Sequence, residues 1–444
     1  MEMNQNEAWK SKLEFGRNKM GLEYLLKNGR NAQVILENCL GNQIAFDSFK
    51  NADVICGDLP WREREFNQRK YEAWQGSDDK RLLHWLDCEW NLNGSPMIQN
   101  ALTEVLKKRS FHPVKEFIEG VTWDGVSRVE NFFSDYLGAE ETEYVRKVTR
   151  LWFAAAVARI YEPGCKFDEM IVLVGGQGIG KSWTIAKLAG EWFSDSLKNL
   201  DNKEAGEHLQ GAWIIEFGEM AGMKKSEVEE IKAFLSKTSD AYRVAYDRVV
   251  TDFPRKCVFI GTTNDPSFLR DQTGNRRFYP IVVDKSKRKH NPFEALSQEI
   301  VHQIWAEALV IYKNGEPLFL DTTIKRFAEE IQKEHTLSDP REGLIDMFLE
   351  MPLPKKWKEL KPYERHNWFK KYQSATEKQN IVGNREKVSA IEIWCECFGN
   401  KQQDFNSWNG REIAEMIRIQ GWKERRPSRT RFIHYGTQTT FTKV

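Results

Sequence analysis

The feature that most constrains this chain is a glycine-rich segment of eight residues, Gly175-Gly176-Gln177-Gly178-Ile179-Gly180-Lys181-Ser182. It fits the pattern G-x-x-x-x-G-K-[ST] at every specified position. The apolar run before it, residues 171–174, is typical of a buried strand, and residues 182–189 are typical of a helix. Strands and helices alternate over residues 165–284, which predicts a three-layer α/β domain with an anion-binding loop after its first strand.

The chemistry of this loop follows from its residue types. Backbone N–H groups of such a loop and of the following helix converge on phosphate oxygens. We expect Lys181 to neutralise the β- and γ-phosphates and Ser182 to hold Mg²⁺. The sequence therefore predicts ATP and Mg²⁺ as cofactors, bound by residues 175–182. The alternative is an ordinary glycine turn between a strand and a helix.

Two acids follow the next predicted strand, residues 212–217. Glu216, at the strand end, is expected to reach Mg²⁺ opposite Ser182. Glu219 is expected to polarise the water that attacks the phosphate. The alternative is that both are surface acids at a strand end. An acid that holds the metal and an acid that orients water together predict hydrolysis rather than binding alone.

Polar residues also follow the predicted strand 256–262 and precede the strand 278–283. Asn264 can hydrogen-bond the γ-phosphate and the attacking water, or can form an Asx-turn before Pro266. Arg276 and Arg277 are the favoured candidates for stabilising charge on the transferred phosphoryl group, with Arg270 as the alternative. A neighbouring subunit can supply such an arginine. The competing interpretation is that these arginines form structural salt bridges.

Bulk properties exclude some classes of protein. The 444 residues are enough for two to four domains, and no run of about 18 apolar residues predicts a membrane span. The first residues lack a basic and an apolar region, so we expect no signal peptide. The seven cysteines are scattered and odd in number, which is typical of a reducing cytosol. We therefore expect a cytoplasmic protein without a membrane partner.

Charge is distributed unevenly along the chain. Residues 351–444 contain 19 Lys and Arg against 10 Asp and Glu, whereas the whole chain has a net charge of only +1. A helix at 410–420, a basic stretch and a β-like tail at 432–441 resemble a winged helix. The basic region predicts contacts with DNA, and the alternative is a solvated basic surface. The candidate DNA-binding residues of this stretch are Arg425, Arg426, Arg429 and Arg431.

Taken together, these patterns predict four segments. The fold class is an α/β P-loop NTPase core with an α-helical N-terminal region and a C-terminal winged-helix-like domain. The segments are a helical N-terminal domain (1–135), a P-loop ATPase core (136–290), a helical extension (291–350) and a basic linker with the winged-helix-like domain (351–444).

The order of these motifs strongly resembles that of the virulence-associated protein E family. Phosphate loop, E-x-x-E acids, a strand that ends in Thr-Thr-Asn and then Gly-Asn-Arg-Arg-Phe follow one another as in that family. Further matching residues are Phe111-His112-Pro113-Val114, Trp123-Asp124-Gly125, Pro163-Gly164-Cys165-Lys166 and Phe268-Leu269-Arg270-Asp271. The family belongs to phage and genomic-island replication proteins and is similar to superfamily 3 helicases of the AAA+ class. The resemblance covers residues 110–285 well.

The resemblance implies a ring, expected to be a homohexamer, with ATP between subunits. Lys181, Ser182, Glu216, Glu219 and Asn264 would line the site in cis, and an arginine from Arg276-Arg277 would complete it in trans. The segment 242–256 would project into the pore. The basic residues there that would contact single-stranded DNA are Arg243, Arg248, Arg255 and Lys256.

Some features of the family pattern leave alternatives open. Arg243 and Arg248 can instead face the nucleotide. Glu216 stands where many relatives of the broader class have Asp. Full-length relatives often carry a primase-polymerase module upstream, and we expect none here, so that a separate primase is a possible partner.

The resulting functional hypothesis is an ATP-dependent DNA helicase or replication initiator of a phage or genomic island, working in the bacterial cytosol or a phage-infected host. Its basic C-terminal domain would hold origin duplex DNA. The alternatives are a DNA-binding initiator or regulator that ATP controls without processive unwinding, and an ATPase that acts on protein.

Overall fold

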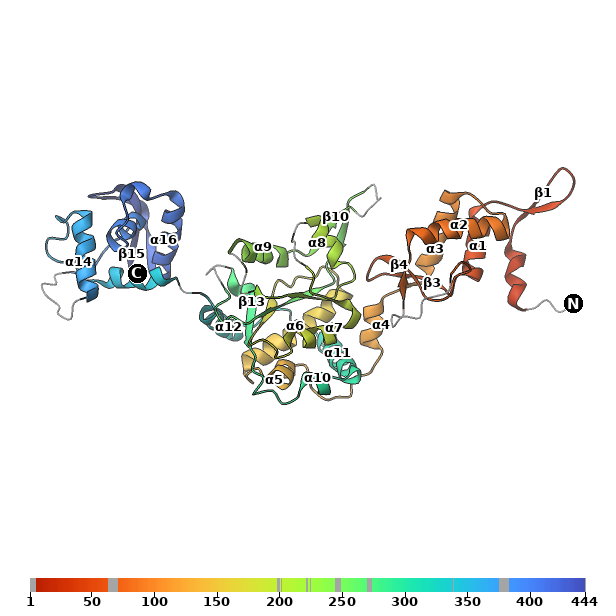
Figure 1. The fold of residues 1–444 in the computed structure, drawn as a ribbon, viewed down its shortest axis with the longest axis horizontal. Coiled ribbons are helices and arrows are strands. Elements are labelled where there is room, and N and C mark those ends of the chain that lie inside the picture. Colours follow the sequence, from red (N-terminus) through yellow and green to blue (C-terminus); the bar gives the residue numbers. More distant parts are fainter. Residues whose placement is uncertain are drawn as a thin grey trace. The chain divides into compact units, whose positions relative to one another are not determined.

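The computed structural model describes residues 5–62, 71–197, 200, 202–220, 223, 225–243, 249–269, 274–337, 339–374 and 383–443. The chain forms two compact units, Met1–Thr336 and Leu337–Val444. Figure 1 shows their helices and strands along the sequence. Among the described residues, no helix is long and apolar enough to cross a membrane.

A five-stranded parallel sheet forms the centre of the first unit. Its strands, in the order in which they pair, are β13 (Phe278–Val282), β7 (Met170–Val174), β12 (Val258–Thr263), β9 (Ile214–Phe217) and β8 (Phe193–Ser194). The three inner strands are buried along their whole length, as expected for a parallel sheet that is covered on both faces. This confirms a mixed α/β fold with a central parallel sheet, and the four predicted strands are present.

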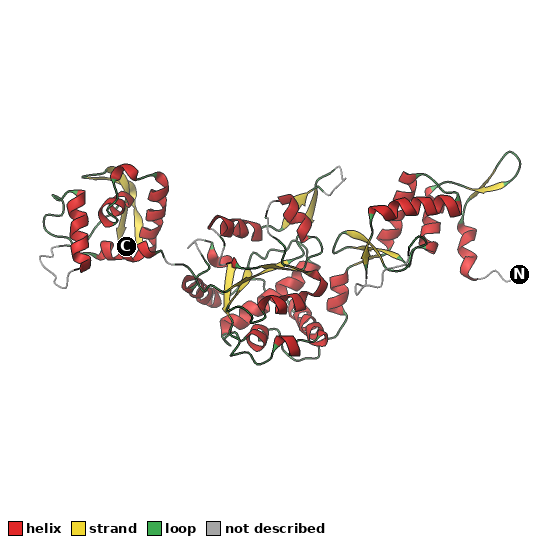
Figure 2. Cartoon of the chain, viewed as in Figure 1, coloured by secondary structure: helices red, strands yellow, loops and turns green. Residues whose placement is uncertain are grey.

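Alternate residues of each strand enter two different hydrophobic cores. Ile171 and Leu173 of β7 belong to one core, while Met170, Val172 and Val174 belong to the other. The first core also contains residues of α6 (Glu143–Tyr161), α7 (Lys181–Ala189) and α11 (Gln298–Lys313), and the second contains residues of α8 (Asn202–Leu209) and α9 (Lys225–Leu235). Figure 2 shows helices on both faces of the sheet.

Helix α6 contributes buried residues to the first of these cores. Thr142 is its N-cap and accepts a hydrogen bond from the backbone N–H of Val145. Trp152 fixes the helix to the sheet because its indole Nε1 donates to the backbone oxygen of Phe259 on β12 (2.9 Å). The helices that complete this part are α10 (Pro292–Ala295) and α12 (Thr322–Glu334).

The N-terminal part contains strands that the predicted helical domain does not include. Alongside α1 (Gly29–Cys39), α2 (Gly76–Trp90) and α3 (Ser95–Lys108), it contains a four-stranded sheet, β5-β4-β3-β6. Its strands are β3 (Ile44–Asp47), β4 (Ala52–Ile55), β5 (Glu72–Ala73) and β6 (Ser110–Phe111), and a separate pair is formed by β1 (Phe15–Arg17) and β2 (Glu23–Leu25). Strands of two to four residues are too short for an alternating pattern to be recognised.

The predicted boundary at residue 135 is also displaced. Helices α4 (Pro113–Glu119) and α5 (Phe132–Leu137) contribute Val114, Ile118, Phe132 and Phe133 to the core that covers the central sheet. These helices therefore pack with the core that covers the central sheet.

The second unit begins within the predicted helical extension. It contains α13 (Pro340–Glu350), α14 (Pro362–Ser374), α15 (Ala390–Glu392), a π-helical turn (Ile393–Cys397), α16 (Ser407–Ile419) and the antiparallel pair β14 (Trp422–Phe432) and β15 (Gly436–Lys443). The predicted linker is wrong, because Trp357 and Phe369 lie in the core of this unit. A helix followed by a hairpin agrees with the predicted order of elements, and the winged-helix assignment stays a prediction.

Candidate functional site

The glycine-rich segment connects β7 to α7, as its sequence predicts. A side chain at Gly175 would bring its Cβ to 2.5 Å from the backbone oxygen of Val283, and Gly180 has a φ of 101°. A Cβ at Gly180 would also lie 3.1 Å from the ring of Phe293. Close packing and left-handed backbone therefore require glycine at both specified positions.

A cavity of about 570 Å³ opens at this loop. Strand β12 lies between β7 and β9, so the loop, the tip of β12 and the residues after β9 converge on one edge of the sheet. The structure thereby brings together residues from three predicted motifs. The cavity is lined by Gln177, Gly178, Ile179, Gly180, Lys181, Ser182, Trp183, Glu219, Thr262, Thr263 and Asn264.

Glu216 lies behind this cavity and is only 3% exposed. Its Oε1 accepts hydrogen bonds from the hydroxyls of Ser182 and Thr262, both at 2.6 Å. Its Oε2 is buried and has no hydrogen-bond partner among the described residues. A buried carboxylate oxygen without a partner is costly, and it points to a ligand that is bound during function.

These oxygen atoms fit a magnesium ion. Mg²⁺ prefers oxygen ligands and is commonly held by one or two carboxylates together with substrate phosphates. Glu216 and Ser182 are residues that would hold it here. Within the described part of the chain, no cluster of three or more His, Cys, Asp or Glu side chains could hold a metal by itself. A site shared with phosphate oxygens is consistent with both observations.

The ammonium group of Lys181 contacts the backbone of the glycine-rich loop. Its Nζ donates to the backbone oxygens of Gly175 (2.5 Å) and Gly176 (2.9 Å). Burial lowers the pKa of this ammonium group, and the negative charge of Glu216 acts in the opposite direction. Because phosphate oxygens can replace the two carbonyls as acceptors, the lysine is positioned for an anionic ligand.

Glu219 and Asn264 also line the cavity, as their motifs predict. Glu219 has a φ of 52°, a left-handed conformation that costs a non-glycine residue about 1 kcal/mol or more. Asn264 is exposed, and the turn that follows uses Asp265, whose Oδ1 accepts from the backbone N–H of Ser267 (2.8 Å). The structure thus gives the Asx-turn to Asp265 rather than to Asn264.

Neither Arg276 nor Arg277 lines this cavity within one chain. Arg276 is exposed, and Arg277 donates from Nε to the hydroxyl of Ser236 (3.0 Å). Arg276 instead lines a separate cavity of about 600 Å³ together with Lys166 and Glu169. The alternative candidate, Arg270, lies outside the described residues.

The predicted pore segment overlaps two antiparallel strands, β10 (Ser239–Tyr242) and β11 (Thr251–Pro254). Arg243 follows β10 and is exposed, while Arg248 lies outside the described residues. The prediction of DNA contacts for Arg255 and Lys256 is wrong in this structure. Arg255 is 2% exposed and forms an ion pair with Asp240, whose oxygens lie 2.7 and 2.9 Å from its Nε and Nη2.

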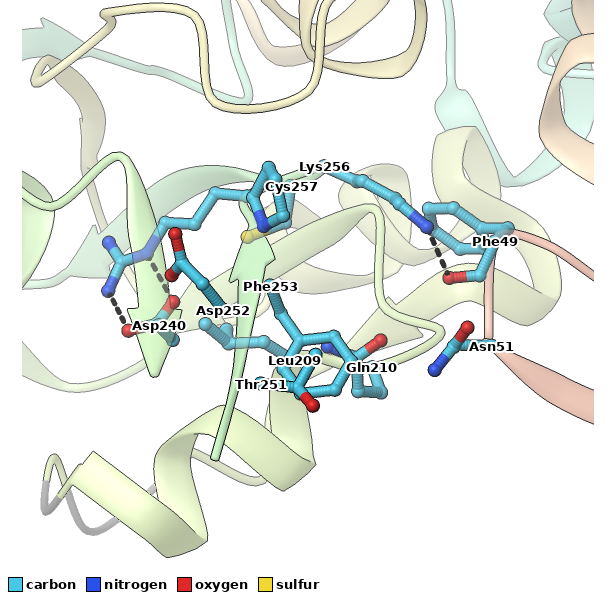
Figure 3. A pocket seen from close by; sticks show the side chains of 12 residues that line it. Phe49, Asn51, Leu209, Gln210, Asp240, Thr251, Asp252, Phe253, Lys256 and Cys257 are labelled. Carbon is cyan, nitrogen blue, oxygen red and sulfur yellow. Dashed lines mark hydrogen bonds and ion pairs between the residues drawn. The ribbon is translucent and has the colours of Figure 1, made fainter. Parts of the chain in front are cut away.

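Lys256 also has a structural role. Its Nζ donates to the backbone oxygens of Ser48 and Phe49, at 2.5 and 3.2 Å, and burial lowers its pKa. Figure 3 shows Lys256 extended toward Phe49 along a cavity of about 280 Å³ at the base of the hairpin. The side chains of Arg255 and Lys256 therefore join segments of the chain. A run of basic residues in the sequence does not show whether the side chains have such a structural role or are exposed to solvent.

The four C-terminal arginines are placed differently. Arg425, Arg426, Arg429 and Arg431 are all exposed on β14. The pairing of β14 with β15 shifts register between Glu424 and Arg429, which is a bulge in the basic stretch. Their exposure leaves them accessible to an anionic partner.

In a comparison with known protein families, residues 118–337 match the model of the virulence-associated protein E-like domain. This part of the chain belongs to the virulence-associated protein E-like family. The virulence-associated protein E-like domain thus includes the central sheet, the loop cavity and both arginine candidates of the short turn before β13. The predicted family is confirmed.

No curated protein matches the chain. Among solved structures, two apo structures of the NrS-1 C-terminal region are similar to it. One, the A form, has 14% identity and a TM-score of 0.46, covering 94% of this chain and 100% of that one. The other has 13% identity and a TM-score of 0.45, covering 90% of this chain and 95% of that one.

Three residues of the site, Trp183, Thr262 and Thr263, are not predicted by the sequence patterns. Thr262 shares Glu216 with Ser182, and Trp183 lines the cavity one position after the phosphate-loop pattern ends. The Thr-Thr-Asn end of β12 is polar throughout, but the motif singles out only Asn264. Sequence position alone does not say which of three successive polar side chains faces the neighbouring strand.

Proposed function

We propose that this chain is an ATP-dependent DNA helicase or replication initiator of a phage or genomic island, which hydrolyses ATP at subunit interfaces to translocate on single-stranded DNA. One observation carries the ATPase part of the proposal. In the described part of the chain, Glu216 accepts a hydrogen bond from the phosphate-loop Ser182 through Oε1 and leaves its buried Oε2 without a partner, where a carboxylate for Mg²⁺ is needed.

Each of the residues that line the cavity has its own role in the proposed hydrolysis. Backbone N–H groups of residues 175–182 bind the phosphates, and Lys181 exchanges its carbonyl partners for phosphate oxygens. Bound Mg²⁺ would neutralise charge on the β- and γ-phosphates. Glu219 orients and polarises the attacking water, and Asn264 hydrogen-bonds the γ-phosphate and that water.

The arginines support a site completed by a second copy of the chain. Arg276 and Arg277 precede β13, and neither lines the loop cavity of its own chain. A guanidinium supplied in trans stabilises charge on the transferred phosphoryl group, and such an arginine can raise turnover about 10³-fold. This arrangement supports a ring, proposed to be a homohexamer.

The test is ATP hydrolysis and strand displacement on forked DNA, with the wild type and Glu219→Gln. We expect the variant to bind ATP but to lose at least about 100-fold in hydrolysis and to displace no strand. Glu104→Gln is the matched control, because Glu104 is a mainly exposed acid on α3 whose carboxylate lies 3.6 Å from the ammonium group of Lys107. Wild-type hydrolysis by Glu219→Gln would remove that residue from the mechanism.

A mixing experiment tests the shared site. Subunits with both Arg276→Ala and Arg277→Ala are combined with Lys181→Ala subunits, each inactive alone. We expect partial recovery of hydrolysis, because some interfaces then join an intact loop to an intact arginine pair. Complete inactivity at every ratio would contradict an arginine that acts in trans.

The exposed arginines of β14 also support the second candidate, an ATP-regulated DNA-binding initiator or regulator without processive unwinding. The two candidates differ in one readout. ATP-dependent DNA binding without strand displacement by the wild type would favour the regulator, whereas displacement that Glu219→Gln abolishes would favour the helicase.

A further inference from the structure

An aromatic pair lies at the mouth of the loop cavity. The rings of Trp183 and Phe293 are 4.9 Å apart between centroids and are tilted by 53°. Trp183 is 38% exposed and Phe293 is 50% exposed, although the two rings contact each other. Two large aromatic side chains that remain this exposed beside a cavity are more often part of a binding surface than of a core.

The packing of α7 does not require a tryptophan at this position. The helix buries Thr184, Ile185, Leu188 and Ala189, and Trp183 lies outside this face. Trp183 instead lines the cavity directly after Ser182. Its place is thus explained by the cavity and not by the hydrophobic core.

The loop itself holds the second ring in place. The ring of Phe293 lies 3.1 Å from where a Cβ of Gly180 would be, and Pro292 lies 3.5 Å from the same point. Phe293 therefore occupies space that only glycine leaves open, and Pro292 is buried at the start of α10. The aromatic pair and the phosphate-binding backbone form one rigid unit, so a ligand held by both has a set distance between its anionic and its aromatic ends.

We infer that Trp183, supported by Phe293, is a stacking platform for the base of the nucleoside triphosphate whose phosphates bind the glycine-rich loop. This inference rests on the proposed function, because it extends the same nucleotide site. Aromatic faces stack on any nucleobase, so the platform supplies affinity for a base and does not select among bases. It distinguishes a nucleotide from an inorganic polyphosphate, which has no ring to stack.

The experiment compares two probes, Mg-ATP and Mg-tripolyphosphate, in equilibrium binding to the full chain. Trp183→Leu is expected to weaken ATP binding about tenfold and to leave tripolyphosphate binding within about twofold of the wild type. Trp183→Phe is expected to restore most of the ATP affinity, because it keeps an aromatic face. Trp408→Leu is the matched control, since Trp408 is a 66% exposed tryptophan in the second unit.

Three results would overturn the platform. Unchanged ATP affinity in Trp183→Leu would show that the ring does not touch the base. An equal loss for both probes would show that Trp183 only supports the loop. A wild-type chain that binds neither probe would reject the proposed nucleotide site, and the platform with it. In the first two results the wild type still binds tripolyphosphate, so those results reject the platform and not the nucleotide site.

Discussion

Glu216 in the first unit and Glu396 in the second are both nearly fully buried, and each has one carboxylate oxygen without a hydrogen-bond partner. They differ in what the other oxygen contacts. Oε1 of Glu216 accepts from two neutral hydroxyls, while Oε1 of Glu396 accepts from the guanidinium of Arg365 (2.8 Å) and from the hydroxyl of Tyr435 (3.1 Å). The two carboxylates are therefore similarly buried, but Glu396 accepts a hydrogen bond from a cation and Glu216 accepts hydrogen bonds from neutral hydroxyls.

The difference teaches how to separate a binding carboxylate from a structural one. Glu396 lies in a buried cluster with Arg365, Arg385 and Glu392, where cations of the same chain face the acids. Glu216 hydrogen-bonds only polar neutral groups and adjoins an open cavity. Burial alone does not indicate function, but a buried acid that accepts hydrogen bonds from neutral hydroxyls and adjoins an open cavity is a candidate for binding a cation.

The largest expected effect comes from removing the charge of Glu216. Glu216→Gln is expected to reduce ATP hydrolysis about 1,000-fold, about 4 kcal/mol in the barrier, because the metal loses its carboxylate. Thermal unfolding should show no loss of stability, since the amide keeps an acceptor oxygen for the hydroxyls of Ser182 and Thr262 and removes a buried negative charge. A large loss of stability with normal hydrolysis would make Glu216 a structural acid like Glu396.

The same chemical change at Glu396 should have the opposite outcome. Glu396→Gln is expected to destabilise the second unit by about 3 kcal/mol, because Arg365 then loses the nearer of its two buried acidic partners and keeps only Glu392, at 3.9 Å. ATP hydrolysis per folded chain should not change. Denaturant unfolding gives the stability, and the hydrolysis assay is the control. Unchanged stability would show that the buried cluster tolerates one acid fewer.

Buried and exposed arginines of the second unit can be compared in the same way as the two glutamates. Arg365 is buried, whereas Arg429 and Arg431 are exposed. The double variant Arg429→Ala/Arg431→Ala is expected to lower DNA affinity about tenfold at low salt. The slope of log K against log salt should fall by about 2, one for each DNA phosphate that the variant no longer neutralises. Lys355→Ala is a control from an exposed lysine of the same unit. An unchanged salt slope would remove these arginines from the DNA interface.

The smallest expected effect is a difference in pH response between the two units. Burial lowers the pKa of His112 to about 4 from 6.5, and its Nδ1 accepts from the backbone N–H of Lys115 at the start of α4. The unfolded chain thus binds a proton between about pH 6.5 and 4 that the folded chain does not. The first unit should therefore lose about 1 kcal/mol as pH falls from 7 to 5.

Glu392 should act in the opposite direction. Burial and the neighbouring Glu396 raise its pKa to about 7 from 4.5, so the folded chain binds a proton between these values that the unfolded chain does not. Acidification from pH 8 to 5 should therefore stabilise the second unit. Thermal unfolding across this range is the measurement. His112→Asn, which keeps a helix cap, and Glu392→Gln should each flatten one response, and unaltered pH profiles would contradict the assignments.

Much of the central sheet could be predicted from sequence because its strands are apolar along their whole length and the loop between β7 and α7 has a specific pattern. Glu219, Asn264, Lys181 and Ser182 could be identified because they follow strand ends at one edge of a parallel sheet. The short strands β3 to β6 could not, since two to four residues carry no readable period.

The basic residues show where sequence reasoning fails. Arg255 and Lys256 are neighbours in a charged segment, and only folding placed Asp240 beside one and the backbone of residues 48–49 beside the other. Arg425 to Arg431 carry a similar pattern and are exposed. The sequence around a charged residue does not show whether its side chain is buried, because the groups that it contacts come from distant parts of the chain.

The sequence by itself determined the glycine-rich loop and the succession of strands and acids that follow it along the chain, because backbone conformation at glycine and the polarity of strand ends are local properties. The tertiary structure decided which atoms are left without partners. It placed β12 between β7 and β9, joined Thr262 and Ser182 to Glu216, and set Trp183 against Phe293. These contacts depend on packing between residues far apart in the chain, and so no local pattern specifies them.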